Sequence, residues 1–462
     1  MEKWIYRILC LLTLLVFVAI FLQEKFRLVD IKELSGAVEK TEKPIFSIAS
    51  YRSGEYQSAL ERYSKENFGF RETFIRCYNQ YLWKFYKETN SPDVMAGKEG
   101  WLYEPLYVRE YYEGLMYNCT DDADVIRQKL TKEARRIFFL QEILKQYGVT
   151  LFVMIEPGKE RIYLEYLPDN TRYTREKQFS AVDFYPLQFD SLGVNYLNMC
   201  AWFENQKGKT DYPLFPQTAT HWSNIAALHV TDTLIRYMES VGGHNIRNMS
   251  IGEPYICETF DPDNDLEKLL NLQFSILDIP NKYADFSIVE DASAEKPSLL
   301  SIGDSFFWNI SYHINLDEIF SSHHFWYYNS TVYYDDRYNS TSEVDLLNEL
   351  LDSDYIMLSY CTAQLYDMPN MFASKALVAL CFDDEQISAK IEGIINSMYA
   401  SEEWLASIKQ KADEQGRPLE DVLRDDACYL LYMDPEQYFD ELRGSDVPKS
   451  RNRRIEEIVI RK

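Results

Sequence analysis

Apolar and polar positions along the middle of the chain predict helices and strands in turn. Apolar residues at helical spacing predict a helix over 131–147, which Gly148 ends. The continuous apolar run 149–155 follows it and is typical of a central strand of a parallel sheet. Further elements of the same kind are predicted as short strands at 194–197, 299–302 and 355–358, and as a helix at 224–241 that Gly242 and Gly243 cap. This order predicts an α/β fold with a parallel sheet flanked by helices on both faces.

The most hydrophobic run of the protein lies near its N-terminus. Residues 8–22 carry no charge and one hydroxyl, and their length lies between that of a signal-peptide core and that of a spanning helix. Because no cleavage site with small residues follows, we expect an uncleaved membrane anchor over residues 1–24. Charge leaves the orientation of this anchor open, since two basic residues flank it on each side.

The remaining segments flank the main domain. Residues 25–93 predict a polar stalk followed by a helical region that packs onto the main domain; its apolar residues recur at helical spacing, as in Phe74, Cys77, Tyr78, Tyr81 and Phe85. We place the main domain at 94–385 and a helical tail at 386–462, with amphipathic helices at 401–415 and 419–432. The last fifteen residues carry six basic side chains and two Glu. They predict a solvated terminus, with contact to anionic lipid or an acidic partner as the alternative.

Charge and cysteine usage exclude some classes of protein. A formal net charge of -25 argues against binding to nucleic acid, because such binding depends on Lys and Arg that neutralise phosphates. Neutral substrates such as sugars stay open, and 35 Tyr, 26 Phe and 8 Trp suit stacking on sugar faces as well as a filled core. The eight cysteines form no C-x-x-C pair and no zinc spacing, so we expect no metal and no cofactor. Cys10 lies in the apolar run, which leaves an odd number for pairing; one or two disulfides stay open.

The segment 298–309 combines a short strand, a turn and the start of a helix. Gly303, Asp304 and Ser305 lie at its centre, and Gly303 permits a sharp turn there. This geometry exposes the Ser305 hydroxyl above the edge of the sheet, beside N–H groups that can hold a developing oxyanion. Taken alone, Gly-Asp-Ser is also an ordinary turn sequence.

Two further segments offer chemistry to this serine. A serine needs a neighbouring base, and His221 precedes a predicted helix that begins near the same end of the sheet; a structural His bonded to backbone is the alternative. The loop after the strand 149–155 carries Lys159 and Tyr163, which could face a sugar or an oxyanion. Hydrogen bonds that anchor this loop are an equal alternative for both residues.

Two acidic or histidine-rich segments resemble metal sites but lack the required pattern. The run from Asp261 to Asp265 resembles the opening of a calcium-binding loop, yet Leu266 stands in place of the required Gly and Leu272 in place of the required Glu. We interpret it as a capped turn. The second segment has irregular spacing and predicts solvent-exposed side chains: His323, His324, Asp335 and Asp336.

Several motifs together resemble the alginate O-acetyltransferase family (AlgJ/AlgX type), which is SGNH-hydrolase-like. They occur in the expected order over roughly residues 60 to 365: Asn67-Phe-Gly-Phe-Arg71, Gly97-Lys-Glu-Gly-Trp-Leu-Tyr103, Ile155-x-Pro-x-Lys159 with Tyr163, Leu167-Pro168, Thr220-His-Trp222 and Gly303-Asp-Ser-Phe306. The resemblance implies an SGNH-like fold and a membrane-anchored protein with its N-terminus inside and its main domain extracytoplasmic. It also implies transfer of acetyl groups onto polysaccharide hydroxyls through an acyl-serine, with the acetyl group supplied by a membrane-bound O-acyltransferase.

The resemblance assigns roles to single residues. Ser305 matches the nucleophile and His221 the base, and the motif positions of Lys159, Tyr163 and Trp222 imply contact with substrate. Two acidic positions of the family hold alanine in this chain. Ala219 lies where the acid that orients the histidine is expected, and Ala363 lies where relatives tend to carry Glu. A distant Asp or a backbone carbonyl that orients His221 instead is left open.

Three functions follow from these residues. An O-acetyltransferase is the leading prediction, because both Ser305 and His221 are present. A non-catalytic relative that binds polysaccharide or holds a secretion complex together is the first alternative, because of the two alanines. A carbohydrate acetylesterase is the second, since only the acceptor, water or sugar, would differ.

Overall fold

The computed structural model describes residues 2–36, 41–114, 122–169, 173 and 179–439. Within these residues the central sheet has the strand order β11-β10-β9-β12-β3-β4. Its strands are β3 (Thr150–Glu156), β4 (Tyr196–Asn198), β9 (Ser298–Gly303), β10 (Ser322–Tyr327), β11 (Thr331–Tyr333) and β12 (Tyr355–Cys361). Neighbours pair in parallel, except the edge pair β10 and β11. The carboxyl ends of β3, β9 and β12 therefore meet at one edge of the sheet.

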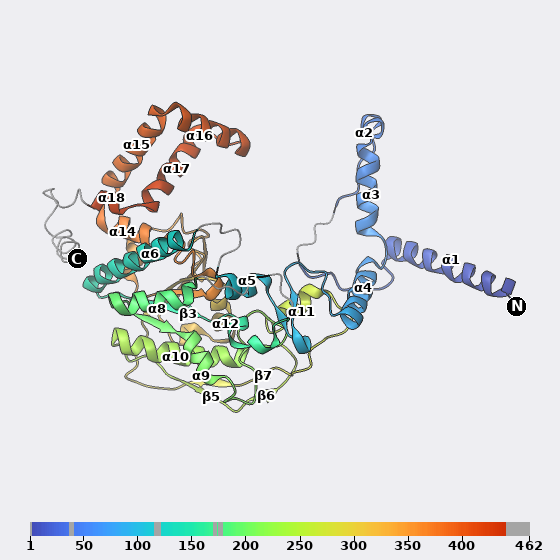
Figure 1. Ribbon diagram of the computed structural model, residues 1–462, viewed down its shortest axis with the longest axis horizontal. Helices are drawn as coiled ribbons and strands as arrows, with labels where there is room; N and C mark the ends of the chain where they lie inside the picture. Colours follow the sequence, from blue (N-terminus) through green and yellow to red (C-terminus); the bar gives the residue numbers. More distant parts are fainter. Residues whose placement is uncertain (1, 37–40, 115–121, 170–172, 174–178, 440–462) are drawn as a thin grey trace.

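Side chains of alternate strand residues point to opposite faces, and each face is covered by its own helices. Leu151, Val153 and Ile155 of β3 pack in one apolar core, whereas Phe152 and Met154 pack in another. The first core contains α6 (Ala123–Leu144), α8 (Ala181–Leu192) and α14 (Phe372–Cys381); the second contains α9 (Met199–Gln206), α10 (Asn224–Gly242) and α12 (Phe306–His313). Figure 1 shows α6 and α10 on opposite sides of the sheet. The predicted α/β fold with a mostly parallel sheet between helices is confirmed.

Smaller elements decorate this framework. In the part of the chain that the structure describes, three antiparallel pairs lie outside the central sheet: β1 (Met95–Ala96) with β2 (Leu102–Tyr103), β5 (Met249–Ile251) with β8 (Phe286–Ile288), and β6 (Tyr255–Ile256) with β7 (Lys282–Tyr283). Short helices of the α type are α5 (Pro105–Glu113), α7 (Lys159–Ile162), α11 (Asp265–Leu270), α13 (Leu346–Asp352) and α18 (Glu436–Phe439). Short 3-10 helices are η1 (Lys98–Gly100), η2 (Lys145–Tyr147), η3 (Leu164–Tyr166), η4 (Leu316–Glu318) and η5 (Thr362–Gln364).

Helix boundaries differ from the predicted ones where a capping side chain decides them. Helix α6 begins at Ala123 instead of residue 131, because the Asp122 side chain accepts a hydrogen bond from the N–H of Asp124. The C-terminal arm contains α16 (Glu402–Gln415) and α17 (Leu419–Met433), as predicted, and also α15 (Asp384–Ala400), which was not predicted. A reciprocal capping box between Asp383 and Gln386 starts α15. The basic end of the tail lies outside the described residues.

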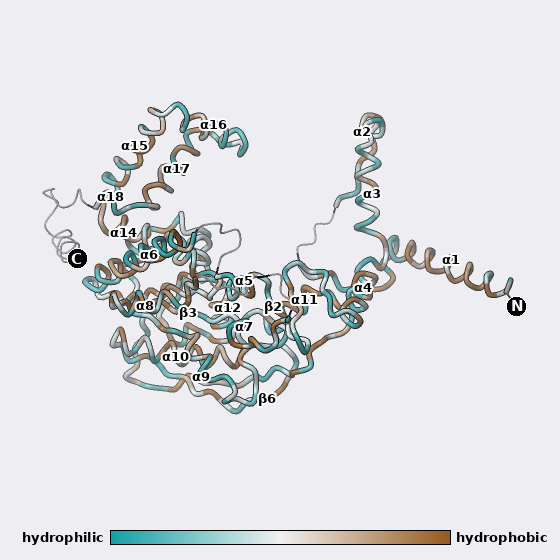
Figure 2. Tube along the Cα trace, in the orientation of Figure 1, coloured by the Kyte–Doolittle hydropathy of each residue, from teal (hydrophilic) through white to brown (hydrophobic). Residues whose placement is uncertain are grey.

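The N-terminal region extends from the main domain. Helix α1 (Glu2–Phe26) is long and apolar enough to cross a membrane by length and composition, and it is the brown, hydrophobic helix that projects outward in Figure 2. Helices α2 (Ile48–Ser53), α3 (Glu55–Asn67) and α4 (Arg71–Tyr86) follow. Helix α4 packs onto the main domain, but through its Arg76, Asn79 and Trp83 side. Its apolar stripe is exposed.

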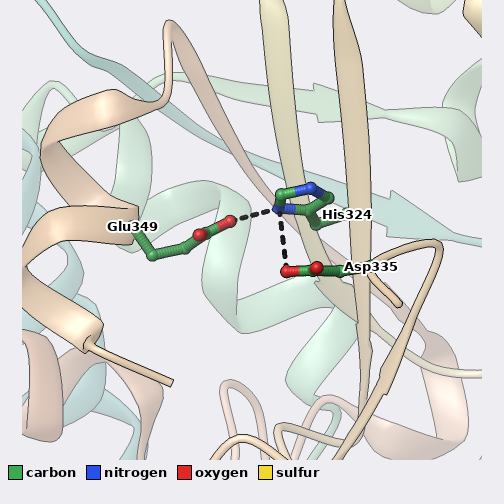
Figure 3. A group of neighbouring side chains, drawn as sticks. All are labelled: His324, Asp335 and Glu349. Carbon is green, nitrogen blue, oxygen red and sulfur yellow. Dashed lines mark hydrogen bonds and ion pairs between the residues drawn. The ribbon is translucent and has the colours of Figure 1, made fainter. Parts of the chain in front are cut away.

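Among the described residues, one group of side chains that could hold a metal ion lies at β10. His324 of β10 faces Asp335 and Glu349, and the ligand atoms of the three lie within 4.8 Å of one another (Figure 3). Arg337 already compensates both carboxylates, since it donates to both Asp335 oxygens at 2.8 Å and lies 3.6 Å from Glu349. The expectation of solvent-facing side chains is therefore wrong for His324 and Asp335. They form an ion-pair network with Arg337, and this network explains their proximity without a metal ion.

The cysteines are reduced wherever they are described. Seven are free, and they are spread over the core and the surface: Cys10, Cys77, Cys200, Cys257, Cys361, Cys381 and Cys428. Cys119 lies outside the described residues.

Candidate active site

Ser305 lies where strand β9 ends and helix α12 begins. Gly303 is the last residue of β9, and a Cβ atom added there would lie 2.2 Å from the Ser359 carbonyl oxygen of the neighbouring strand β12. Glycine is thus required because the two strands approach closely. Its backbone conformation is not the reason, because its φ is not in the left-handed region. Asp304 then fixes the turn: its Oδ1 accepts from the N–H of Phe306 at 3.0 Å, and its Oδ2 from the N–H of Cys361 at 2.8 Å. These bonds hold Ser305 as the N-cap residue of α12.

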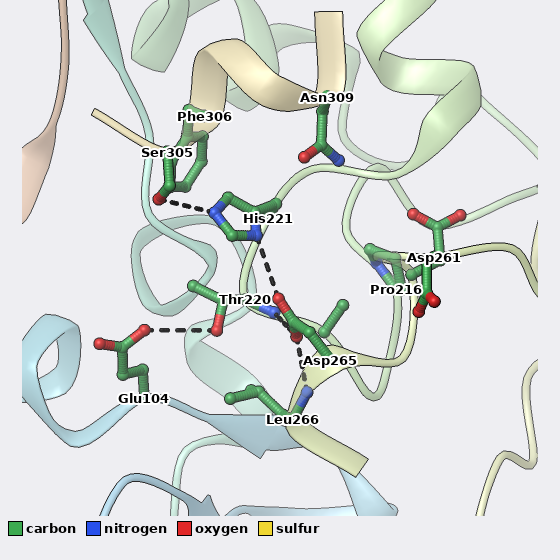
Figure 4. Close-up of polar contacts among 12 residues, drawn as sticks. Glu104, Pro216, Thr220, His221, Asp261, Asp265, Leu266, Ser305, Phe306 and Asn309 are labelled. Atoms are coloured by element: carbon green, nitrogen blue, oxygen red, sulfur yellow. Dashed lines mark hydrogen bonds and ion pairs between the residues drawn. The ribbon is translucent and has the colours of Figure 1, made fainter. Parts of the chain in front are cut away.

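His221 faces this serine. Its Nε2 lies 2.8 Å from Ser305 Oγ, and its ring packs against the ring of Phe306 with the centroids 4.9 Å apart (Figure 4). The residue ends the loop before α10, whose N-cap is Ser223. The imidazole is thus in hydrogen-bond reach of the hydroxyl proton that a general base must remove.

Asp265 supplies a carboxylate on the other side of the imidazole. Its Oδ2 lies 3.1 Å from His221 Nδ1, and its Oδ1 accepts from the N–H of Thr220 at 2.9 Å and of Leu266 at 2.6 Å (Figure 4). Asp265 is the first residue of α11, at the end of the acidic run that we interpreted as a capped turn. Sequence reasoning missed its role, because only the fold brings it next to His221. Of the two alternatives left open for a group that orients His221, the structure shows the distant Asp and not a backbone carbonyl.

The surroundings of His221 favour its protonated form. Burial opposes protonation, but the hydrogen bond to Asp265 and the charges of Asp265, Asp304 and Glu104 outweigh it and raise the pKa of His221. Glu104 Oε2 accepts from Thr220 Oγ1 at 3.3 Å, beside the histidine. Burial raises the pKa of Glu104 against the opposing charge of His221. The dyad of His221 and Asp265 therefore stabilises an imidazolium.

A cleft opens beside Glu104. Its volume is about 690 Å³, and its lining includes Asp93, Glu104, Arg109 and Tyr173. Through its bond to Thr220, Glu104 connects the wall of this cleft to the loop that carries His221. Pockets that bind small molecules typically measure about 300–1,000 Å³, so this cleft is large enough for such a ligand.

A pair of buried carboxyl groups lies below the turn of Ser305. Glu156 ends β3 with no exposed surface and accepts a hydrogen bond from the Ser359 hydroxyl. Burial, together with the nearby charge of Asp304, raises the pKa of Glu156 well above its usual range. Burial also raises the pKa of Asp304, and the hydrogen bonds from the N–H groups of Phe306 and Cys361 oppose this shift.

Lys159 anchors the loop that leads to His221. It is 3% exposed, and its Nζ donates to the carbonyl oxygens of Ala219, Pro216 (3.2 Å) and Gln217 (3.4 Å). Burial lowers its pKa to about 7. The alternative of a loop-anchoring hydrogen bond therefore describes Lys159.

Tyr163 and Trp222 are likewise built into the interior. The Tyr163 hydroxyl accepts from the N–H of Leu214 at 2.8 Å, which ties it to the same loop. Trp222 has no exposed surface; it stacks on Phe203 and meets Phe306 edge-on. Both residues pack against or hydrogen-bond to the segment that leads to His221. Neither lies on an open surface of the site.

Comparison with known proteins identifies the type of domain. Residues 94–296 match the family described as SGNH hydrolase-like domain, acetyltransferase AlgX. This match contains His221 and Asp265 and ends before Ser305. None of the curated protein sequences matches the chain.

Solved structures with a similar arrangement share little sequence with this chain. The O-acetyltransferase domain of Pseudomonas putida AlgJ is 15% identical, with a TM-score of 0.40, over 64% of this chain and 98% of that one. Pseudomonas aeruginosa AlgX is 13% identical, with a TM-score of 0.36, over 59% and 67%. Bacillus cereus PatB1 is 12% identical, with a TM-score of 0.36, over 59% and 96%. The match of residues 94–296 agrees with the resemblance in the motifs: this part of the chain is similar to the SGNH hydrolase-like domain of the acetyltransferase AlgX.

Proposed function

We propose that this protein is a membrane-anchored O-acetyltransferase that moves acetyl groups onto polysaccharide hydroxyls through an acyl-serine on Ser305. One observation carries the proposal: the continuous chain of hydrogen bonds from Asp265 through His221 to Ser305. The alanine at position 219 no longer favours a non-catalytic relative, because Asp265 takes the place of the expected acid.

The proposed reaction has two halves. Ser305 Oγ attacks the carbonyl carbon of the acetyl donor while His221 Nε2 accepts the hydroxyl proton, and the N–H of Ser305 donates to the oxyanion. The bond from the carbonyl to the donor breaks, and His221 returns the proton to the leaving group. A sugar hydroxyl then attacks the acetyl-serine, His221 accepts its proton, and the Ser305 oxygen leaves and is protonated again. Asp265 keeps the Nδ1 proton in place throughout.

The surroundings of the reaction are part of the same proposal. We divide the chain into an anchor (1–24), a stalk with a packing helix (25–93), a main domain (94–385) and a helical tail (386–462). The N-terminus lies inside, and the main domain lies on the extracytoplasmic side, where a membrane-bound O-acyltransferase supplies the acetyl group. The apolar helix α1 supports the anchor. Protease accessibility tests this orientation. A protease that passes the outer layer of the cell but not the cytoplasmic membrane should digest the main domain.

Substitution of the two reacting residues tests the catalytic proposal. Ser305→Ala and His221→Ala should each reduce acetate release from an aryl acetate, and transfer to oligosaccharides, on the order of 10⁴ to 10⁶ fold. Ser311→Ala, on the same helix α12, and His244→Ala, at the far end of α10, are matched controls that should retain activity. Unchanged activity in the first two variants would contradict the proposal.

A serine-reactive fluorophosphonate separates the enzyme from its non-catalytic alternative. An enzyme should form an adduct on Ser305 that depends on His221, whereas a polysaccharide-binding relative should form none. Competition between water and a sugar acceptor for the acetyl group then distinguishes the transferase from a carbohydrate acetylesterase.

A further inference from the structure

Helix α4 carries a row of aromatic side chains on its outer side. The side that packs onto the protein carries Trp83, which lies in a small apolar core, and Arg76 and Asn79, whose side chains donate to backbone carbonyl oxygens of Lys32, Glu33 and Leu270 at 2.8 Å. The opposite side carries a stripe at helical spacing, Phe74, Tyr78, Tyr81 and Phe85, and these four side chains are between 47% and 66% exposed. A helix side that faces water typically carries polar and charged residues, so this exposed aromatic stripe is a candidate contact surface.

The stripe lies at the base of the apolar helix α1. A Cβ atom added to Gly69, two residues before α4, would lie 2.2 Å from the Ile20 carbonyl oxygen and 2.8 Å from the Glu24 N of α1. The last turns of α1 therefore rest directly on the turn before α4. Figure 1 shows α4 at this junction, running across the direction of α1.

The junction is held by hydrogen bonds as well as by packing. Gln23 is buried, and its side chain both accepts from the N–H of Val29 at 3.0 Å and donates to the Val29 carbonyl oxygen at 2.7 Å. These two hydrogen bonds between the Gln23 side chain and the Val29 backbone close the turn that ends α1. The motif Asn67-Phe-Gly-Phe70 thus packs directly against the end of α1. This contact fixes the position of α4 relative to α1.

Positive charges frame the stripe in an otherwise acidic protein. Arg71 lies at its start, and Lys84 and Lys87 lie at its end, with Lys84 Nζ 6.0 Å from the ring of Phe85. Residues 71–88 contain four basic and two acidic side chains and are therefore net positive, whereas the net charge of the whole chain is -25. Aromatic rings flanked by Lys and Arg are the composition that favours the interface of an anionic bilayer.

We propose that the outer face of α4, formed by Phe74, Tyr78, Tyr81 and Phe85, lies in the interface of an anionic lipid bilayer beside the anchor α1. The inference rests on the proposed membrane anchoring. The contact between Gly69 and the last turns of α1 places α4 at the membrane surface, where α1 leaves the bilayer. Helix α4 then lies along that surface. The main domain is then held in one orientation by two contacts with the membrane, α1 and α4, instead of one.

Depth-dependent quenching in vesicles tests this contact with the full-length chain. The exposed Cys10 and Cys77 are first replaced by Ser. A fluorescent thiol label is then placed by Tyr78→Cys or Tyr81→Cys, with Leu12→Cys in α1 as the anchor position and Leu187→Cys, 67% exposed on α8, as the main-domain control. Each protein is inserted into vesicles of phosphatidylglycerol and phosphatidylcholine and quenched by nitroxide-bearing lipid or by aqueous iodide.

The labels at 12, 78 and 81 should be quenched by the lipid and protected from iodide, and the label at 187 should show the reverse. Labels at 78 and 81 that iodide quenches while the lipid quenches the label at 12 would overturn the α4 contact and leave the anchor. Iodide quenching at 12 as well would overturn the anchoring proposal itself. Self-quenching at 78 that falls on dilution would assign the stripe to a second copy, and equal protection in pure phosphatidylcholine would overturn the role of anionic lipid. Equal melting temperatures in detergent confirm that the variants fold.

Discussion

The carboxylate of Asp265 lies 3.1 Å from His221 Nδ1, although the two residues are 44 positions apart in the sequence. The same carboxylate accepts from the N–H of Thr220, so it fixes both the ring and the backbone that carries the ring. The position two residues before His221 holds Ala219, whose carbonyl oxygen accepts from Lys159 instead. The carboxylate next to His221 thus comes from a distant segment, at the first residue of α11.

Removing the carboxylate of Asp265 should nearly abolish turnover. We expect Asp265→Asn to lower kcat on the order of 10⁴ fold, because an amide leaves the imidazolium unsupported and permits the wrong tautomer. The measurement is acetyl transfer at saturating donor. Asp261→Asn is the matched control, since Asp261 lies on the same loop and pairs with Lys268 at the surface. A full rate in Asp265→Asn would exclude Asp265 from the reaction.

The pH dependence of the reaction should report the raised pKa of His221. A base must be neutral to accept the serine proton, so kcat/KM should rise with pH through a pKa above the ordinary value of about 6.5. Asp265 raises that pKa, and the residual activity of Asp265→Asn should therefore have its acid limb at lower pH. An acid limb that stays at the same pH would show that another group controls it.

Lys159 should affect the position of His221 without touching substrate. Lys159→Met removes the donors to the carbonyl oxygens of residues 216, 217 and 219 and should destabilise the fold by about 1–3 kcal/mol. A small displacement of His221 should also lower kcat on the order of 10²-fold with little change in KM. Lys209→Met is the control, because Lys209 is exposed and bonds only to Asn205 among the residues described. A change confined to KM would point to substrate contact instead.

Gly303 should tolerate no side chain. In Gly303→Ala the new Cβ would meet the Ser359 carbonyl oxygen, so β9 and β12 must separate; we expect a loss of about 1–3 kcal/mol and a displaced Ser305. Gly393→Ala in α15 meets nothing within 4 Å and should stabilise its helix by about 0.5–1 kcal/mol. Thermal unfolding of both variants measures the contrast. An unchanged melting temperature in Gly303→Ala would contradict the steric argument.

Much of the framework could be predicted from the sequence because local pattern decides it. The apolar run at 149–155 could only be a buried strand in its context, and β3 occupies Thr150–Glu156. The predicted helix from residue 224 ends at Gly242, with Gly243 as its cap. The α15 helix was missed because its signal is a capping box of two polar residues, which stands out less than an apolar stripe.

The sequence by itself determined the α/β order, the apolar N-terminal helix and the pair Ser305 and His221, since each depends on residue type and local spacing. Only the tertiary structure decided three other matters. It placed Asp265 next to His221, and it buried Lys159 among the carbonyl oxygens of residues 216, 217 and 219. It also left the aromatic stripe of α4 exposed. The physical reason is the same in each case. A side chain's partners and its exposure depend on which distant segments pack against it, and the periodicity of one segment contains no information about those neighbours.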